Sequence, residues 1–111
     1  MSEISWADFE KVEIRTGTII AATDFPEARK PAYKLAIDFG ELGIKKSSAQ
    51  ITAHYPKEAL VGKQIVAVVN FPPKQIGPFL SECLVLGAIQ EDGSVVVLQT
   101  EQDVKNGLRI A

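Results

Sequence analysis

Apolar and polar residues alternate along most of the chain, and this period of two begins at Val12. Strict alternation is typical of half-buried β-strands. The segment 64–71 is apolar throughout, which favours a central strand covered on both faces, whereas 44–52 has one polar face. The predicted strands cover residues 12–21, 33–40, 44–52, 64–71, 81–90 and 95–100.

Two segments break the alternation and predict short helices. The first covers residues 5–11, where Ser5 is a good N-cap residue and Asp8 follows three positions later, close to a capping box. Trp6 and Phe9 then fall on one face of this helix. The second covers residues 55–63 and predicts a single helical turn ended by Gly62.

Glycine and turn dipeptides divide the strands. Gly17 lies in the middle of the first strand, which predicts a bend or bulge there. Asp92-Gly93 is a strong hairpin signal, and Asn106-Gly107 predicts a second turn near the end of the chain.

The order of elements predicts an all-β domain with short helices, in which the strands form a β-barrel. A bent first strand and a helix between the third and fourth strands fit the five-stranded OB-fold. We therefore expect one domain over residues 1–111, with the N-terminal helix covering one end of the barrel and a C-terminal hairpin as an extension. The apolar strand 95–98 would leave an adhesive edge, so a two-fold homodimer that buries it is expected.

Composition agrees with this picture: the chain has 111 residues, 46% apolar and 23% charged, as expected of a soluble globular domain. No apolar run reaches the length of a membrane span, and the N-terminus lacks the features of a signal peptide. No membrane insertion and a cytoplasmic location are expected. Cys83 is the only cysteine, and we expect it to be a small buried apolar residue.

Charge is unevenly distributed along the chain. The formal net charge is −2, but residues 29–74 carry eight basic and three acidic residues and so have a charge of +5. This segment predicts a basic face that meets a polyanion or an acidic peptide. The alternative is a scatter of solvated lysines. A pI of about 5.4 argues against a dedicated high-affinity nucleic-acid binder.

The residues of a catalytic site are missing from the sequence. His54 is the only histidine and has no partner at metal-ligand spacing, so a hydrogen-bonded structural role is expected for it. No phosphate-binding loop, dinucleotide fingerprint or nucleophile elbow occurs. We expect a protein that is not an enzyme and that needs no cofactor and no metal.

The connection between the last two barrel strands is stiff and apolar. Pro72, Pro73 and Pro78 restrict its backbone, Ile76 stands between them, and Phe79 follows Pro78. Such a connection predicts apolar side chains held toward solvent. The alternative is that Ile76 and Phe79 fold inward and close the end of the barrel.

Three sequence segments carry a family resemblance: "FPEARKPAYKL", "SSAQIT" and "NFPPKQIGPF". With them, residues 8–88 resemble the CsaA family of export-related chaperones, within the wider group of tRNA-binding OB domains. The resemblance implies a homodimeric OB-fold chaperone for unfolded or precursor polypeptides bound for secretion, with protein-export machinery as a further partner. Ser81 and Glu82 keep the pattern of the wider group, whereas Cys83 and Leu84 replace its usual glycine and methionine.

Two ligand hypotheses follow. The first is a peptide-binding site on the third strand and the proline-rich connection, where polar groups meet an extended backbone and apolar groups anchor side chains. Its candidate residues are Lys45, Lys46, Ser48, Gln50, Asn70, Phe71, Lys74, Ile76, Phe79, Ser81 and Glu82.

The second hypothesis is tRNA or single-stranded nucleic acid on the same face. Arg29, Lys30 and Lys34 would contact phosphates, together with the lysines of the first hypothesis. Bases would stack on aromatic rings, and the candidates, for which core packing is the alternative, are Tyr33, Tyr55 and Phe71. A third reading is a dimerisation or docking module without a soluble ligand.

Overall fold

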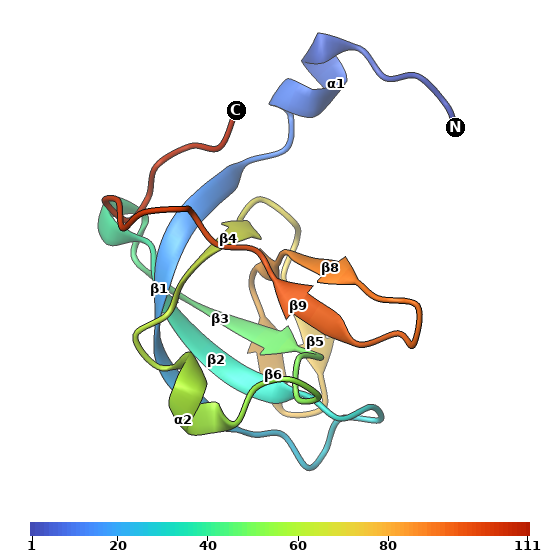
Figure 1. Cartoon of the computed structure of the whole chain (residues 1–111), viewed down its shortest axis with the longest axis vertical. Helices are drawn as coiled ribbons and strands as arrows, with labels where there is room; N and C mark the ends of the chain where they lie inside the picture. The colour runs from blue at the N-terminus through green and yellow to red at the C-terminus, as the bar shows by residue number, and fades with distance from the viewer.

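The computed structural model describes all 111 residues. It is organised around one five-stranded sheet that curls into a nearly closed barrel (Figure 1). The strands follow one another in the order β3-β2-β1-β4-β7, with all neighbours antiparallel. This confirms the prediction of an all-β OB-fold. The barrel strands are β1 (Ile14–Asp24), β2 (Tyr33–Asp38), β3 (Ile44–Ala49), β4 (Gln64–Val68) and β7 (Leu84–Val85).

The barrel core follows the alternation in the sequence. Along β2, Tyr33, Leu35 and Ile37 are buried, and the residues between them are half-buried. In β4 every residue after Gln64 is buried, as the continuous apolar run predicts. Burial of these side chains supplies the main favourable free energy of folding.

The bulge of the first strand does not lie at Gly17. The register of β1 against β2 shifts between Ile19 and Ala21, so the bulge lies at Ile20. At Gly17 a Cβ atom would stand 2.7 Å from side-chain atoms of Ile37 and Phe39. The glycine is therefore required by close packing against the ring of Phe39.

The N-terminal helix forms, but it does not cover the barrel. In α1 (Trp6–Glu10) the Ser5 hydroxyl accepts a hydrogen bond from the Asp8 N–H at 3.0 Å, and the Asp8 carboxylate accepts one from the Ser5 N–H at 3.1 Å. The helix stands clear of the sheet (Figure 1) and has no buried residue. Trp6 is 86% exposed, so the predicted lid over one end of the barrel is wrong for a single chain.

The remaining elements are short. Strand 81–90 of the sequence prediction is broken: its residues are shared among three strands, because Glu82, Cys83 and Leu86 interrupt the pairing. The chain also contains α2 (Lys57–Leu60), the 3-10 helix η1 (Gly40–Leu42), β5 (Lys74–Ile76), β6 (Phe79–Ser81), β8 (Gly87–Ile89) and β9 (Val95–Val97). None of the helices has the length and hydropathy needed to span a bilayer.

The predicted hairpin at Asp92-Gly93 is confirmed, since β8 pairs with β9 and Gly93 has a φ of 86°. Its second strand is less exposed than the sequence suggests. Val97 is buried in the core and its N–H donates to the Tyr55 hydroxyl at 3.1 Å. Val96 and Leu98 remain exposed.

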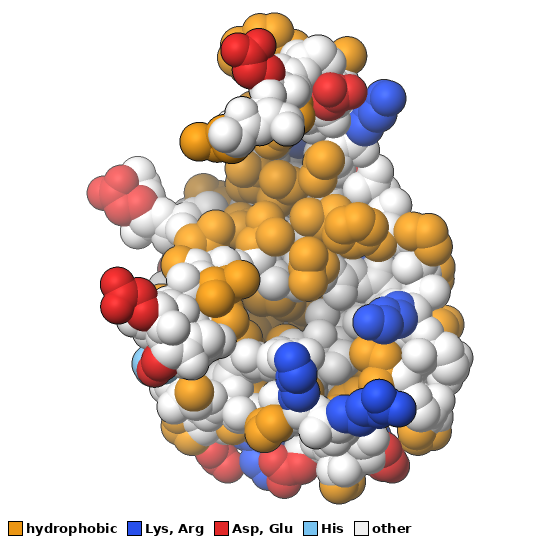
Figure 2. Space-filling view, turned by 90° about the vertical axis from the view of Figure 1, so that its right-hand side faces the viewer, with side chains coloured by type: hydrophobic (Ala, Val, Ile, Leu, Met, Phe, Trp, Pro, Cys, Tyr) orange, Lys and Arg blue, Asp and Glu red, His pale blue; other side chains and the backbone are white.

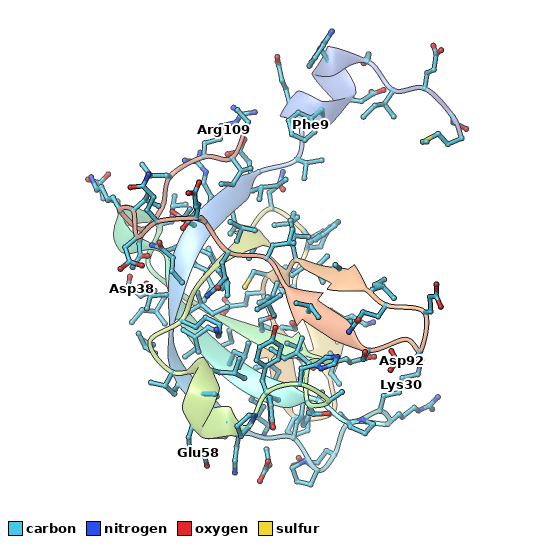
Figure 3. The ribbon with its side chains drawn as sticks, in the orientation of Figure 1. Phe9, Lys30, Asp38, Glu58, Asp92 and Arg109 are labelled. Atoms are coloured by element: carbon cyan, nitrogen blue, oxygen red, sulfur yellow. The ribbon has the colours of Figure 1, made fainter.

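The C-terminal segment returns across the outside of β1. The predicted turn at Asn106-Gly107 is present, with a φ of 87° at Gly107. The Gly107 N–H donates to the carbonyl of Thr16 at 2.7 Å, and Arg109 forms an isolated bridge with Arg15. This segment also meets α1, because the Arg109 guanidinium donates to the carbonyl of Glu10 at 3.3 Å. Phe9 and Arg109 accordingly lie at the same end of the molecule (Figure 3).

Candidate functional site

The proline-rich connection folds as a hairpin rather than an irregular loop. Strands β5 and β6 pair from Lys74 with Ser81 to Ile76 with Phe79. The turn between them is made by Gly77, with a φ of 53°, and Pro78. Pro72 and Pro73 precede β5, where proline fixes the backbone without removing a ladder hydrogen bond.

Phe79 attaches this hairpin to the barrel. Its ring packs edge-on against Phe25 with the centroids 5.4 Å apart, and Phe25 is buried. The ammonium groups of Lys34 and Lys46 lie 5.9 and 5.4 Å from the Phe79 ring centroid, within the range of a cation–π contact. Phe79 is thus half-buried and packs against Phe25, in the loop that follows β1.

Polar groups join β6 and the start of β7 to the edge of β3, where no strand ladder closes the barrel. The Glu82 N–H donates to the carbonyl of Lys46 at 2.8 Å, and the Glu82 carboxylate accepts from the Lys46 N–H at 3.0 Å. The Ser48 N–H donates to the Ser81 hydroxyl at 3.0 Å. These bonds hold the hairpin at a fixed distance from β3.

A hollow of about 480 Å³ lies between the hairpin and β3, and we call it the apolar hollow. Phe71 is 54% exposed at its edge, and Ile76 is half-buried in its wall. The volume is in the range of sites for small ligands or peptide side chains. The apolar hollow is lined by Ser48, Gln50, Phe71, Pro72, Lys74, Ile76, Ser81, Glu82, Cys83 and Leu84.

Two further hollows adjoin it, and Ser48 and Gln50 line all three. The basic hollow, of about 500 Å³, adds Glu27, Ala28, Arg29, Lys30, Ala32, Gln75 and Gly77 to residues shared with the apolar hollow. The hairpin hollow, of about 390 Å³, contains no charged residue and lies against β7, β8 and Val95. Together the three hollows form what we call the cleft.

The cleft has an apolar part and a cationic part. The side of the molecule that carries β8 and β9 in Figure 1 faces the viewer in Figure 2, where apolar side chains gather below α1 and Lys and Arg side chains lie beneath them. Lys30 lies at the end of the molecule opposite to Phe9 (Figure 3). An extended ligand along this face would meet apolar groups first and cations afterwards.

The structure brings together most of the residues predicted from the sequence. Seven of them line the apolar hollow: Ser48, Gln50, Phe71, Lys74, Ile76, Ser81 and Glu82. Arg29 and Lys30 line the basic hollow. Lys34, Lys45, Lys46, Asn70 and Phe79 line none of the three hollows.

The side chain of Asn70 bonds the N-terminal segment. Its side-chain oxygen accepts from the Glu13 N–H at 3.0 Å, and its amide donates to the carbonyl of Lys11 at 2.7 Å. The residue thus fixes the chain between α1 and β1. Lys34 is similarly occupied, because its ammonium lies 5.0 Å from the Phe25 ring centroid and 4.0 Å from the Glu27 carboxylate.

Pro72, Cys83 and Leu84 line the apolar hollow but are not among the predicted site residues. Pro72 lies just before β5, and Cys83 and Leu84 follow β6, where the pairing of the hairpin stops. The alternation of apolar and polar residues does not show where that pairing stops. Cys83 is 6% exposed, which confirms its expected burial. Burial raises the pKa of its thiol to about 11, so the thiol stays neutral at physiological pH.

His54 is hydrogen-bonded, as expected for a structural histidine. Its Nε2 lies 2.8 Å from the Ser94 hydroxyl and 2.9 Å from the Gln90 amide nitrogen. The Ser94 hydroxyl and N–H in turn lower the pKa of the Asp92 carboxyl by donating hydrogen bonds to it. This network fixes the β8–β9 hairpin, which forms one wall of the hairpin hollow. The chain brings no three His, Cys, Asp or Glu residues together in a metal-binding arrangement.

Comparison with known proteins shows what this barrel and cleft resemble. The family model described as "Putative tRNA binding domain" matches residues 14–109. The methionine–tRNA ligase of Methanocaldococcus jannaschii is 31% identical over 110 residues, which are 99% of this chain and 17% of the ligase. The chain thus spans about a sixth of the length of the curated relatives it matches.

Two solved structures match along their whole length. The chaperone CsaA of Bacillus anthracis has 53% identity and a TM-score of 0.94, and the match covers 99% of this chain and all of that one. The CsaA chaperone of Picrophilus torridus has 55% identity and a TM-score of 0.92, covering 98% of this chain and all of that one.

The chain therefore belongs to the tRNA-binding domain family, a class of OB-fold domains that includes a part of methionine–tRNA ligases. Within this class, its full length and its identity of 53–55% make it similar to the proteins named CsaA chaperone. This confirms the resemblance found in the sequence.

Proposed function

We propose that the chain is a non-catalytic chaperone that binds unfolded or precursor polypeptides in the cleft, acts in the cytoplasm before export, and hands its clients to export machinery. The observation that carries the proposal is the apolar hollow, whose walls are held open by the Phe79 anchor and by the Glu82 and Ser81 bonds to β3. The full-length similarity to proteins named CsaA chaperone supports it.

A rigid cleft suits weak binding to many sequences. Pro72, Pro73 and Pro78 restrict the hairpin before it binds, so less conformational entropy is lost on binding. A client side chain that buries ~60 Å² in the apolar hollow gains about 1.5 kcal/mol. Such a gain depends on size and polarity rather than sequence, which is what a chaperone with varied clients requires.

The alternative function is binding of tRNA or single-stranded nucleic acid. It is favoured by the family model and by Arg29, Lys30 and Lys74 in the basic hollow. Few aromatic rings are available for base stacking, however. Tyr33 is buried with its hydroxyl bonded to the carbonyl of Tyr55, and the Tyr55 hydroxyl accepts from Val97. Only Phe71 of the three predicted rings offers an exposed face.

Salt dependence separates the two functions. We expect an uncharged, end-capped dodecapeptide of Leu, Val and Ser to bind with a dissociation constant that changes less than about twofold between 50 and 300 mM NaCl, because apolar burial is insensitive to screening. A uridine dodecamer that used four phosphate contacts would lose about a hundredfold in affinity over the same range. Fluorescence anisotropy measures both.

Tight binding of the uridine dodecamer with no binding of the peptide would overturn the chaperone proposal in favour of the nucleic-acid function. Binding of neither probe would leave a dimerisation or docking module, the third reading of the sequence.

The proposal includes a homodimer. Ile4 and Trp6, just before and at the start of α1, are 69% and 86% exposed, and no residue of α1 is buried. On the β8–β9 hairpin, Ile89 is 78% exposed, and Val96 and Leu98 are also exposed. Apolar surfaces of this extent mark association sites, and a second copy supplies the same surfaces for mutual burial. A dimer would also offer two clefts to one client and raise its apparent affinity.

We expect the purified chain to have twice the mass of one subunit in light scattering, and the Ile4→Ser/Trp6→Ser variant to have the mass of one subunit, because the variant loses the apolar contacts of α1. The matched control is Ile20→Ser, which removes an exposed apolar residue at the bulge of β1 and should leave the dimer intact. A wild-type chain that is monomeric at tens of micromolar would contradict the homodimer.

A further inference from the structure

The charge of the cleft changes systematically from one end to the other. No charged residue lines the hairpin hollow. Lys74 and Glu82 line the apolar hollow, and Glu82 uses one carboxylate oxygen to accept the N–H of Lys46. The basic hollow contains three cations and one carboxylate.

Within the basic hollow, the cationic side chains form no ion pair, whereas the carboxylate of Glu27 does. Glu27 lies 4.0 Å from the Lys34 ammonium. Arg29, Lys30 and Lys74 make no ion pair within 4.0 Å, and no protein group accepts a hydrogen bond from their side chains. Three unpaired cations at the end of an apolar cleft raise the local concentration of anionic groups.

We propose that the cleft selects segments in which an apolar stretch is flanked by acidic residues, with the apolar side chains in the apolar and hairpin hollows and the acidic ones at Arg29, Lys30 and Lys74. This rests on the proposed function, in which the cleft binds extended polypeptides. Ser48 and Gln50 line all three hollows, so one extended backbone that passes over them reaches both ends. Segments flanked by lysine are disfavoured because like charges meet at the basic end.

The test uses three end-capped, fluorescein-labelled peptides with one Leu/Val block followed by three aspartates, three serines or three lysines. At 50 mM NaCl the aspartate peptide should bind the full-length chain about tenfold more tightly than the serine peptide, since each exposed ion pair contributes modestly. The lysine peptide should bind more weakly than the serine peptide. At 500 mM NaCl the three affinities should converge.

The Arg29→Glu/Lys30→Glu variant should invert the order of the two charged peptides, so that the lysine peptide binds more tightly than the aspartate peptide. The matched control is Lys11→Glu/Lys105→Glu, which changes the net charge equally but at exposed residues outside the cleft. It should keep the wild-type order.

The outcomes separate the two proposals. If the serine peptide binds but the aspartate peptide binds no better, the charge selection is overturned while polypeptide binding stands. If no peptide binds and a uridine dodecamer binds with an affinity that Arg29→Glu/Lys30→Glu abolishes, the basic hollow is a nucleic-acid contact, and both proposals are overturned.

Discussion

Replacement of Gly17 by valine should unfold the barrel or lower its melting temperature by more than about 10 °C. A Cβ at position 17 would lie 2.7 Å from atoms of Ile37 and Phe39, both of which are 0% exposed. The two branches of valine would crowd the same space. Overpacking of a dense core costs about 1–3 kcal/mol and occasionally more. Thermal unfolding followed by circular dichroism measures the effect.

The control is Ala21→Val, on the same strand. Ala21 is exposed beside the bulge, so this change should alter stability by less than about 0.5 kcal/mol. Gly17→Ala should fall between the two, because it adds the clashing Cβ without the branches. A Gly17→Val protein that melts within a few degrees of wild type would contradict the packing argument.

Periodicity was sufficient to predict the barrel, because burial along β2 and β4 depends on which side of a sheet a residue faces. It could not place the bulge at Ile20 or assign Gly17 its packing role, since both depend on which residue lies across the sheet. The lid expected from Trp6 and Phe9 was wrong for a related reason. An amphipathic helix face indicates that a partner surface exists, but not which chain supplies it.

The sequence predicted those site residues whose position depends on their immediate neighbours. It did not predict those whose position depends on contacts with distant parts of the chain. The prolines and the apolar residues of 70–84 indicated a rigid apolar surface, and Ile76 and Phe71 do line the hollow. Phe79 could not be assigned from its neighbours, because its partner Phe25 is 54 positions away in a different loop. The place of Asn70 outside the hollows was not predictable either, because its bonds to Lys11 and Glu13 join segments that are far apart in the sequence.

The second large effect concerns ligand affinity. Phe71→Ser/Ile76→Ser should weaken binding of the uncharged dodecapeptide on the order of a hundredfold, because two apolar contacts of roughly 1.5 kcal/mol each are lost. Phe71 is more than half exposed and Ile76 is half-buried on a surface hairpin. The melting temperature should therefore fall by only a few degrees. Anisotropy titration and thermal unfolding of the same preparation measure the two quantities.

Two further variants are measured in the same experiment, one as a control and one to test the anchor of the hairpin. Leu42→Ser/Ile44→Ser removes two exposed apolar residues outside the cleft and should leave peptide affinity unchanged. Phe79→Ala should lower both stability and affinity, because it releases the hairpin from Phe25 and so changes the width of the hollow. Wild-type affinity in the Phe71→Ser/Ile76→Ser protein would place the peptide elsewhere on the molecule, since both residues line the apolar hollow.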